Sequence, residues 1–328
     1  MRNILLIISL LSFVSIGKLF SQDAEFSQFY ANSAYLNPAF VGNTKCPTMT
    51  MSYRSQWTAL SGNYSTAIAA YEQNSNTLRG GVGIILFNDE SSTNLLSTNT
   101  ISALYSNQQQ LSRNLYIRMG LQTTYNQKNI NWDNLTFPDQ IDPSLGFIYQ
   151  TQQPIIGGVA RYVDFSSGLV LYSDKAFIGF AAHHMNEPNE TVTFGGSYLP
   201  AKYTVHGGVT LPLYKVRNEV ISTISPNLMY RQQGEFKQLN MGLYVDKDPL
   251  TFGLWYRGWL GENYRDALIG YVGVKMEKFH FGYSYDFTVS ELIGNSGGTH
   301  EISLRLNLNC NNYKQKHKPI PCASFYNP

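Results

Sequence analysis

The sequence predicts an all-β fold, a single transmembrane antiparallel β-barrel of the outer-membrane type with about fourteen strands. Three observations support this prediction. Charged residues make up 14% of the chain, well below the roughly 25% of a typical soluble domain. Aromatic residues also reach 14%, with 23 Tyr and 18 Phe. From residue 48 onward, apolar and polar side chains alternate in segments of about ten residues, as they do in transmembrane strands.

Residues 1–21 have the pattern of a secretory signal peptide. Arg2 precedes an apolar run at 4–11, and the segment ends near the small residue Ser21. A buried N-terminal helix is the alternative, but polar residues follow the segment at once. Beyond it, no apolar run approaches the ~20 residues of a membrane-spanning helix. We therefore expect export, a mature chain beginning near Gln22 or Asp23, and a multi-pass barrel in the cell outer membrane.

An N-terminal segment at 22–45 precedes the first predicted strand and is rich in aromatic and amide side chains. Two placements stay open for it. As a plug it would enter the lumen, and as a periplasmic surface it would offer aromatic side chains as anchors for a partner. These anchors are Phe26, Phe29, Tyr30 and Tyr35. We favour a partly inserted segment, followed by the barrel at 46–310 and a periplasmic tail at 311–328.

The clearest predicted strand is 278–287, where five aromatic side chains share one face and His280, Ser284 and Asp286 share the other. Its successor at 299–309 points leucines outward and polar residues inward. The remaining strands are predicted at 48–54, 63–72, 79–88, 95–106, 115–125, 164–172, 176–185, 202–211, 220–231, 239–245, 250–257 and 265–276.

The predicted connections alternate in length, as expected for a barrel with both termini in the periplasm. Short periplasmic turns are predicted at 173–175, 246–249 and 277–278. Long outer loops are predicted at 126–163, 186–201 and 288–298. Barrel closure would bring Cys46 and Cys310 to the same periplasmic rim. We hypothesise a disulfide among Cys46, Cys310 and Cys322, with the pairing open.

The lumen-facing residues Asp286, Glu301 and Arg305 are expected to form a charge-compensated network on the last hairpin. This network would either shape a docking site for a partner or brace the hairpin, and we favour the brace. A metal site is not expected at His183 and His184, because adjacent strand residues point to opposite faces.

No enzyme motif is apparent in the sequence. His280, Ser284 and Asp286 share a face but span ~20 Å, too far for a catalytic triad. No phosphate-binding loop, nucleophile elbow or paired-cysteine motif is present. The 24 Lys and Arg are scattered and the net charge is only +2, so nucleic acid is not an expected partner. We expect a protein that is not an enzyme and has no cofactor.

Several segments carry a family resemblance. They are FSQFYANSAYLNPAFVG at 26–42, YRSQW at 53–57, a Gly-rich strand at 80–89, and YSYDFTVSELIGNSGGTHEISLRL at 283–306, with a looser match in FIGFAAHHMNEP at 177–188. Together they resemble the PorP/SprF family of type IX secretion system outer-membrane proteins of Bacteroidetes. The tail from Cys310 onward looks peculiar to this sequence.

The resemblance implies a barrel that works in type IX protein secretion and gliding motility. It would bind periplasmic ring and peptidoglycan-anchored linker proteins, or a large secreted adhesin or its C-terminal domain. The alternatives are a channel for a small or hydrophobic solute and, with less support, a barrel hydrolase. The candidate partner-binding or structural residues are Phe26, Gln28, Phe29, Tyr30, Asn37, Pro38, Tyr53, Arg54, Trp57, Asp286, His300, Glu301 and Arg305.

Overall fold

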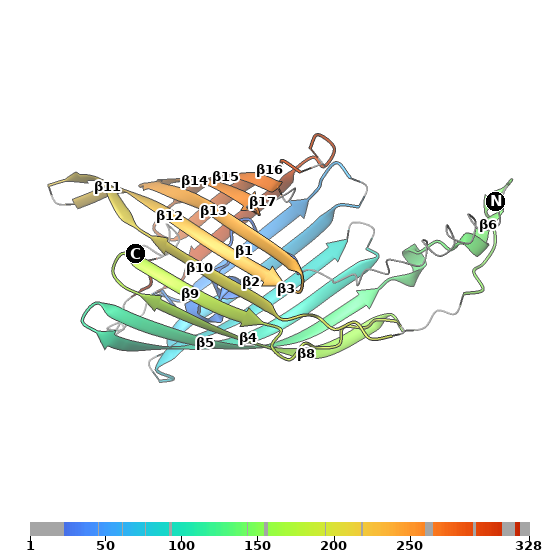
Figure 1. Cartoon of the computed structure of the whole chain (residues 1–328), viewed down its shortest axis with the longest axis horizontal. Helices are drawn as coiled ribbons and strands as arrows, with labels where there is room; N and C mark the ends of the chain where they lie inside the picture. Colours follow the sequence, from blue (N-terminus) through green and yellow to red (C-terminus); the bar gives the residue numbers. More distant parts are fainter. Residues whose placement is uncertain are drawn as a thin grey trace, which may run out of the picture.

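The computed structural model describes residues 23–44, 46–60, 62–75, 77–91, 94–142, 144–153, 157–193, 195–217, 219–259, 265–290, 293–309 and 319–321. Most of these residues belong to one large sheet (Figure 1). Its strands are β1 (Thr48–Gln56), β2 (Tyr64–Ser75), β3 (Gly80–Ser91), β4 (Leu96–Ser112), β5 (Leu115–Ile130), β8 (Val159–Tyr172), β9 (Ala176–His183), β10 (Lys202–Val209), β11 (Leu211–Val216), β12 (Glu219–Gln233), β13 (Phe236–Lys247), β14 (Leu250–Gly258), β15 (Arg265–Lys275), β16 (Phe279–Thr288) and β17 (Thr299–Asn307).

The sheet closes on itself as an antiparallel barrel. β1 pairs with β17, so the first and last strands lie side by side. β10 pairs with β12, and β11 continues beyond β10 to pair with the first part of β12. The barrel therefore has 14 strands, as the sequence predicted. Among the described residues, none forms a helix with the length and apolarity that a membrane crossing requires.

Each of the fourteen predicted strands is present, although several are longer than predicted. β4 runs to Ser112 and β5 to Ile130, and β8 begins at Val159. The residues added to β4 and β5 are mostly polar, so they lack the apolar alternation that marks lipid-facing strands. Their main-chain groups nevertheless continue the hydrogen-bonded ladder, which does not depend on side-chain polarity. The connection between β5 and β8 is correspondingly shorter than predicted, at 131–158.

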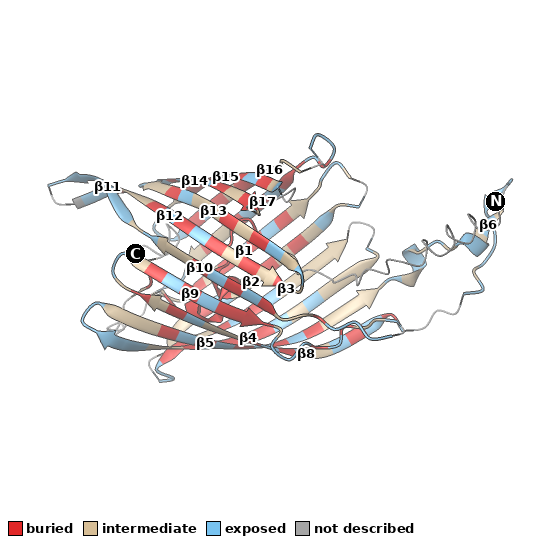
Figure 2. Ribbon diagram, viewed as in Figure 1, coloured by how far each residue is buried: buried red, intermediate tan, exposed pale blue. Residues whose placement is uncertain are grey.

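Side chains alternate between the two faces of the barrel as expected for transmembrane strands (Figure 2). On β16, Phe281 and Phe287 are exposed on the outer face, whereas Ser284 and Asp286 are buried inside. The pleated backbone of a strand sets this period of two. The two faces differ in chemistry because lipid selects apolar side chains on one face while the lumen accepts polar ones.

The connections fall into two groups at opposite ends of the barrel. We call one end the turn rim; its connections include 113–114, 173–175 and 276–278. The other end is the loop rim, where the three longest connections are found, at 131–158, 184–201 and 289–298. The sequence analysis places the turn rim in the periplasm.

An N-terminal segment, residues 23–43, lies inside the barrel, and we call it the plug. It includes the short helices α2 (Ser33–Leu36) and η1 (Pro38–Phe40). Phe29 packs edge-on against Trp255 of β14, with ring centroids 4.6 Å apart. Tyr30 and Phe40 belong to the same buried cluster. The hydrophobic core of the molecule is therefore inside the lumen, between the plug and the inner wall.

Candidate functional site

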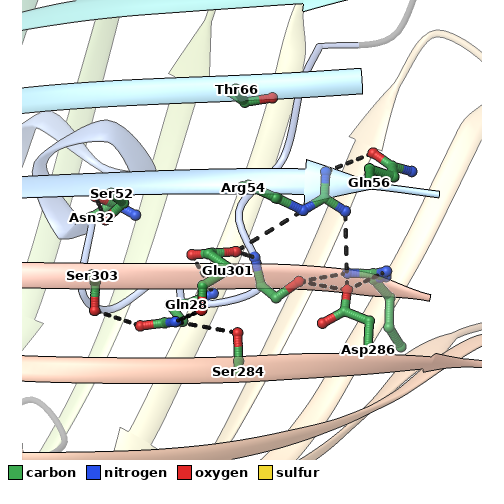
Figure 3. Close-up of polar contacts among 12 residues, drawn as sticks. Gln28, Asn32, Ser52, Arg54, Gln56, Thr66, Ser284, Asp286, Glu301 and Ser303 are labelled. Carbon is green, nitrogen blue, oxygen red and sulfur yellow. Dashed lines mark hydrogen bonds and ion pairs between the residues drawn. The ribbon is translucent and has the colours of Figure 1, made fainter. Parts of the chain in front are cut away.

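Two carboxylates of the last hairpin bind the start of the plug (Figure 3). Glu301 of β17 accepts hydrogen bonds from the backbone N–H groups of Ser27 and Gln28, at 2.6 and 3.1 Å. Asp286 of β16 accepts one from the Ser27 hydroxyl at 2.6 Å. Both carboxylates are buried. The N-terminal and C-terminal motifs of the sequence, far apart along the chain, thus form one structural unit.

The Gln28 side chain completes this unit. Its amide nitrogen donates to the Ser284 hydroxyl at 3.2 Å and to the Glu301 carbonyl at 2.9 Å. Its carbonyl oxygen accepts from the Ser303 hydroxyl at 2.6 Å. Both ends of the side chain are engaged, and a buried amide with satisfied groups selects one position along the strands. Figure 3 shows Gln28 between β16 and β17.

Arg54 and Arg257 supply the positive charge for the two carboxylates. Arg257 Nη2 of β14 lies 2.9 Å from Asp286 Oδ2. Arg54 of β1 lies 3.9 Å from both Asp286 and Glu301. Removing one partner of a buried ion pair of this kind lowers the free energy of unfolding by far more than the intact pair contributes to it. The reason is that the remaining charge stays buried without compensation.

The predicted network of Asp286, Glu301 and Arg305 is wrong in one member. Arg305 Nη2 instead lies 3.6 Å from Glu72 Oε1, nearer the turn rim. Arg305 follows Glu301 by four residues on one strand, which separates them by ~13 Å. Barrel closure places Arg54 next to Glu301, since these residues face each other in the β1–β17 register. The network also holds the plug, in addition to bracing the hairpin.

The end of the plug is bound near the turn rim. The backbone N–H of Gly42 donates to Glu72 Oε2 at 2.8 Å. The Val41 carbonyl accepts hydrogen bonds from the Ser106 hydroxyl, at 2.8 Å, and from Arg118. Glu72 therefore joins the plug to Arg305, just as Glu301 joins it to Arg54 at the other end.

The middle of the plug turns at Asn37, which caps η1. The Asn37 side chain accepts from the Ala39 N–H at 2.9 Å, and Pro38 occupies the first helical position. This turn packs directly on Gly120 of β5 and Gly168 of β8, which pair with each other in the sheet. A Cβ on Gly120 would lie 2.3 Å from the Ala39 nitrogen, and one on Gly168 would lie 1.9 Å from Asn37 Oδ1.

We expect Gly120→Ala to loosen the plug, because the new methyl group overlaps main-chain atoms that cannot turn away. Overpacking of this kind costs about 1–3 kcal/mol. Protease accessibility of residues 23–43 in the folded barrel should rise. Gly270→Ala is the matched control, since a Cβ there meets nothing within 4 Å. Equal protection in both variants would show that the plug does not depend on this contact.

The beginning of the plug is held by charges near the loop rim. Asp23 Oδ2 lies 2.7 Å from His184 Nε2 and also pairs with Lys202. The other ring nitrogen of His184 lies 2.9 Å from Asp164 Oδ2. Two residues further along the plug, Glu25 pairs with Arg231. The lumen wall thus neutralises both plug carboxylates.

The sequence reasoning on His183 and His184 requires correction. His184 follows the end of β9 and has a φ of +55°, so the alternation of a regular strand does not apply to it. Both residues consequently line the same cavity. His183 Nε2 lies 3.2 Å from the Leu36 carbonyl of the plug. Within the described part of the chain, no group of three or more His, Cys, Asp or Glu could hold a metal ion.

The Asp23 contact depends on the charge of His184. Burial alone would lower the pKa of His184, but the carboxylates of Asp23 and Asp164 outweigh it and raise the pKa to about 9. Burial would raise the pKa of Asp23, but His184 and Lys202 reverse this and lower it well below its usual value. At neutral pH, both partners are charged.

We expect the beginning of the plug to become more mobile as the pH rises through about 9. A histidine with a raised pKa stabilises fully below its unfolded pKa, and the contribution is lost as the pH passes its folded pKa. Hydrogen exchange in residues 23–30, corrected for intrinsic rates, should therefore accelerate between pH 7 and about 10. His184→Gln should abolish this dependence; an unchanged pH profile in that variant would contradict the assignment.

A cavity of about 580 Å³ lies between the plug and the loop rim. Asp23, Glu25 and Tyr35 of the plug line it together with residues near the loop-rim ends of the strands, including Arg54, Lys128 and Glu190. Lys128 and Glu190 form an ion pair at 2.8 Å. The cavity is therefore a charged vestibule with the plug as part of its wall.

The structure brings most, but not all, of the predicted site residues together. Tyr53 and His300 point outward from β1 and β17, and His300 Nδ1 lies 2.9 Å from the Tyr283 hydroxyl. Trp57 lies at the loop rim, where its backbone N–H donates to the Gly298 carbonyl at 2.9 Å. The residues buried in the lumen are Phe26, Gln28, Phe29, Tyr30, Asn37, Arg54, Asp286, Glu301 and Arg305, together with Pro38.

Sequence reasoning missed Glu72, Arg118, Arg231 and Arg257, all of which contact the plug or its ligands. Each is a charged residue within or at the edge of a predicted strand. Because lipid excludes charge, every such residue is expected to face the lumen. Counting charges on strands would therefore have identified them, but not their partners.

Cys46 is disulfide-bonded. The other two cysteines of the chain are Cys310 and Cys322. Both lie outside the described residues. The predicted pairing among the three cysteines therefore stays a prediction.

This chain matches one protein family by sequence and is similar in structure to several solved barrels. The family model described as type IX secretion system membrane protein PorP/SprF matches residues 18–306. A search of curated proteins found no match.

Solved structures that are similar include the toluene transporter TbuX of Ralstonia pickettii, with 10% identity, a TM-score of 0.47, and coverage of 84% of this chain and 94% of that chain. A TodX monoaromatic hydrocarbon channel deltaS2 mutant has 11% identity, a TM-score of 0.49, and coverage of 85% and 94%. The outer membrane protein Omp33 of Acinetobacter baumannii has 7% identity, a TM-score of 0.43, and coverage of 80% and 98%. At these identities the likeness concerns the fold alone.

Proposed function

Since the chain belongs to the PorP/SprF family of type IX secretion system membrane proteins, we propose that it acts as a connector. In this role, the outer-membrane barrel binds a secreted surface protein, periplasmic components of the machinery, or both. Through these contacts it supports the export of that surface protein or its attachment to the cell. Catalysis is not part of the proposal.

The plug held inside the lumen is the observation that supports this function best. The plug is bound at its start by Glu301 and Asp286, in its middle by the wall around Gly120, and at its end by Glu72. Its aromatic side chains are packed in the hydrophobic core. A barrel built around a fixed plug is suited to presenting surfaces at its two rims, where partner proteins on either side of the membrane are within reach.

The alternative, a channel for a small or hydrophobic solute, requires the plug to leave or to move aside. The vestibule reaches the plug from the loop rim, and the plug is part of its wall. On this alternative, the contacts of the plug with Glu301, Asp286 and Glu72 would break to let a solute pass towards the turn rim. We therefore rank the connector first.

Deleting the gene and analysing the cell surface by quantitative proteomics tests the proposal. We expect one or more secreted surface proteins to be lost from the surface, while uptake of small solutes stays the same. Loss of a single protein would indicate a dedicated partner, and loss of all type IX cargo a component of the machinery. An intact surface proteome with reduced solute uptake would favour the channel instead.

A further inference from the structure

The connection between β5 and β8 carries exposed apolar side chains far from the barrel wall. It extends beyond the loop rim, where it ends in a short hairpin of β6 (Ile141–Asp142) and β7 (Gly146–Phe147) (Figure 1). Leu145 is 71% exposed and Phe147 62% exposed. We call the exposed apolar residues of this hairpin the knob; they are Ile141, Leu145, Phe147, Ile148 and Tyr149. Figure 2 shows the exposure of this region.

Hydrogen bonds hold the knob in one conformation. The Asp142 carboxylate accepts from the backbone N–H groups of Ser144 and Leu145, at 2.8 and 3.0 Å, and from the Tyr149 hydroxyl at 3.1 Å. The Gln140 carbonyl accepts from the N–H groups of Ile148 and Tyr149 at 3.1 and 3.2 Å. Asp142 therefore binds the main chain at Leu145 directly.

A second set of contacts supports the base of the hairpin. Asp139 accepts from the Thr151 hydroxyl at 3.0 Å and from the Gln152 N–H at 2.7 Å. The Gln140 side chain accepts from the Phe137 N–H at 2.7 Å. Apolar side chains on an ordered hairpin lose little conformational entropy when a partner covers them. A clustered and ordered apolar surface of this kind is typical of an interaction site.

The charge of the loop indicates whether the knob binds a membrane surface or a protein. Residues 131–158 contain Asp133, Asp139 and Asp142, but no Lys, Arg or His. Segments that lie on membrane surfaces combine apolar side chains with Lys and Arg, which attract anionic lipids. The loop has the opposite charge. A protein whose apolar groove is bordered by Lys and Arg matches both its shape and its charge.

We propose that the knob is the docking element for the secreted surface protein, and that it inserts into an apolar groove bordered by basic side chains on that protein. This inference rests on the proposed function, because it assigns the loop rim as the site of cargo contact. Leu145 and Phe147 are the central anchors. Asp133 lies exposed near the base of the loop and contributes to the attraction of the basic border.

The test compares three strains: the gene deletion, a Leu145→Ser/Phe147→Ser variant, and a Gln150→Ser/Gln153→Ser control that removes two exposed polar side chains from the same loop. The deletion first identifies which secreted protein depends on the barrel. In the knob variant, the affinity of the barrel for that protein should fall about 30-fold, as expected for loss of central anchors, and the amount of the protein held at the surface should fall with it. The control variant should retain that protein at the surface. Heat-modifiable migration in gels confirms that both variant barrels are folded.

A photo-crosslinking amino acid, p-benzoylphenylalanine, at position 147 provides the second readout. We expect an adduct with the same secreted protein that the deletion strain loses. Adducts with lipid or lipopolysaccharide alone, adducts with a second copy of the barrel alone, or full surface retention in the knob variant would each overturn the inference. If the deletion leaves every surface protein in place, the proposed function itself fails, and the two failures are thereby distinguished.

Discussion

Deletion of residues 23–43 is expected to convert a closed barrel into a conducting pore. Barrels of eight strands are filled by their own side chains, whereas barrels of 16–18 strands enclose an aqueous channel. With 14 strands, the wall leaves an interior that the plug occupies. Removing the plug takes away Tyr30 and Phe40 and opens the space between the wall residues of the cluster, such as Trp255, and the buried polar side chains of the lumen. Planar-bilayer recordings should show conductance steps that are absent from the intact protein.

The control for this experiment is a chain of native length in which Tyr53→Ser replaces an exposed outer-face residue. It should stay closed, which separates the effect of the plug from that of a perturbed barrel. If the intact protein conducts as well as the deletion variant, the plug does not close the lumen. That result would move the assignment towards the solute channel.

The second large effect is expected from Asp286→Ala. This substitution removes the acceptor of the Ser27 hydroxyl and leaves Arg257 and Arg54 with reduced compensation in the lumen. Breaking one side of a buried ion pair costs about 3–5 kcal/mol. The midpoint of urea unfolding, followed by the gel shift between folded and unfolded barrel, should fall accordingly. His300→Ala, on the outer face of the same hairpin, should leave the midpoint nearly unchanged.

A double-mutant cycle tests the stated cause. Arg257 also pairs with Asp266, so Asp286→Ala removes one of its two carboxylate partners. When Arg257→Met accompanies Asp286→Ala, the guanidinium that loses this partner is absent, so the cost of removing Asp286 should shrink. If Asp286→Ala costs the same in both backgrounds, the two side chains are not coupled. The stabilisation would then have to come from the hydrogen bond to Ser27 or from the ion pair with Arg54.

The strands and the faces of the barrel could be predicted from the sequence because their causes are local. Strand geometry sets a period of two and lipid makes one of the two faces apolar, so the aromatic side chains of 278–287 identified the outer face of β16 without knowledge of its neighbours. Where lipid contact ends, the signal ends as well. The polar extensions of β4 and β5 were missed for that reason.

The motifs could be recognised in the sequence, but their purpose could not. The segment at 26–42 and the last hairpin each stood out, yet nothing local indicates that Ser27 and Gln28 contact Glu301. That contact joins residues more than 270 positions apart. It exists because the first and last strands pair and the plug returns into the space that they enclose.

By itself, the sequence determined that this protein is a barrel of about fourteen strands with a polar lumen, since alternation and strand length are properties of each segment. Only the tertiary structure decided which charges meet. Arg305 was expected to join Asp286 and Glu301 because all three lie on the neighbouring strands of the last hairpin, whereas barrel closure supplies Arg54 instead. Ion pairs inside a barrel depend on register and closure, which are properties of the whole sheet rather than of any one strand.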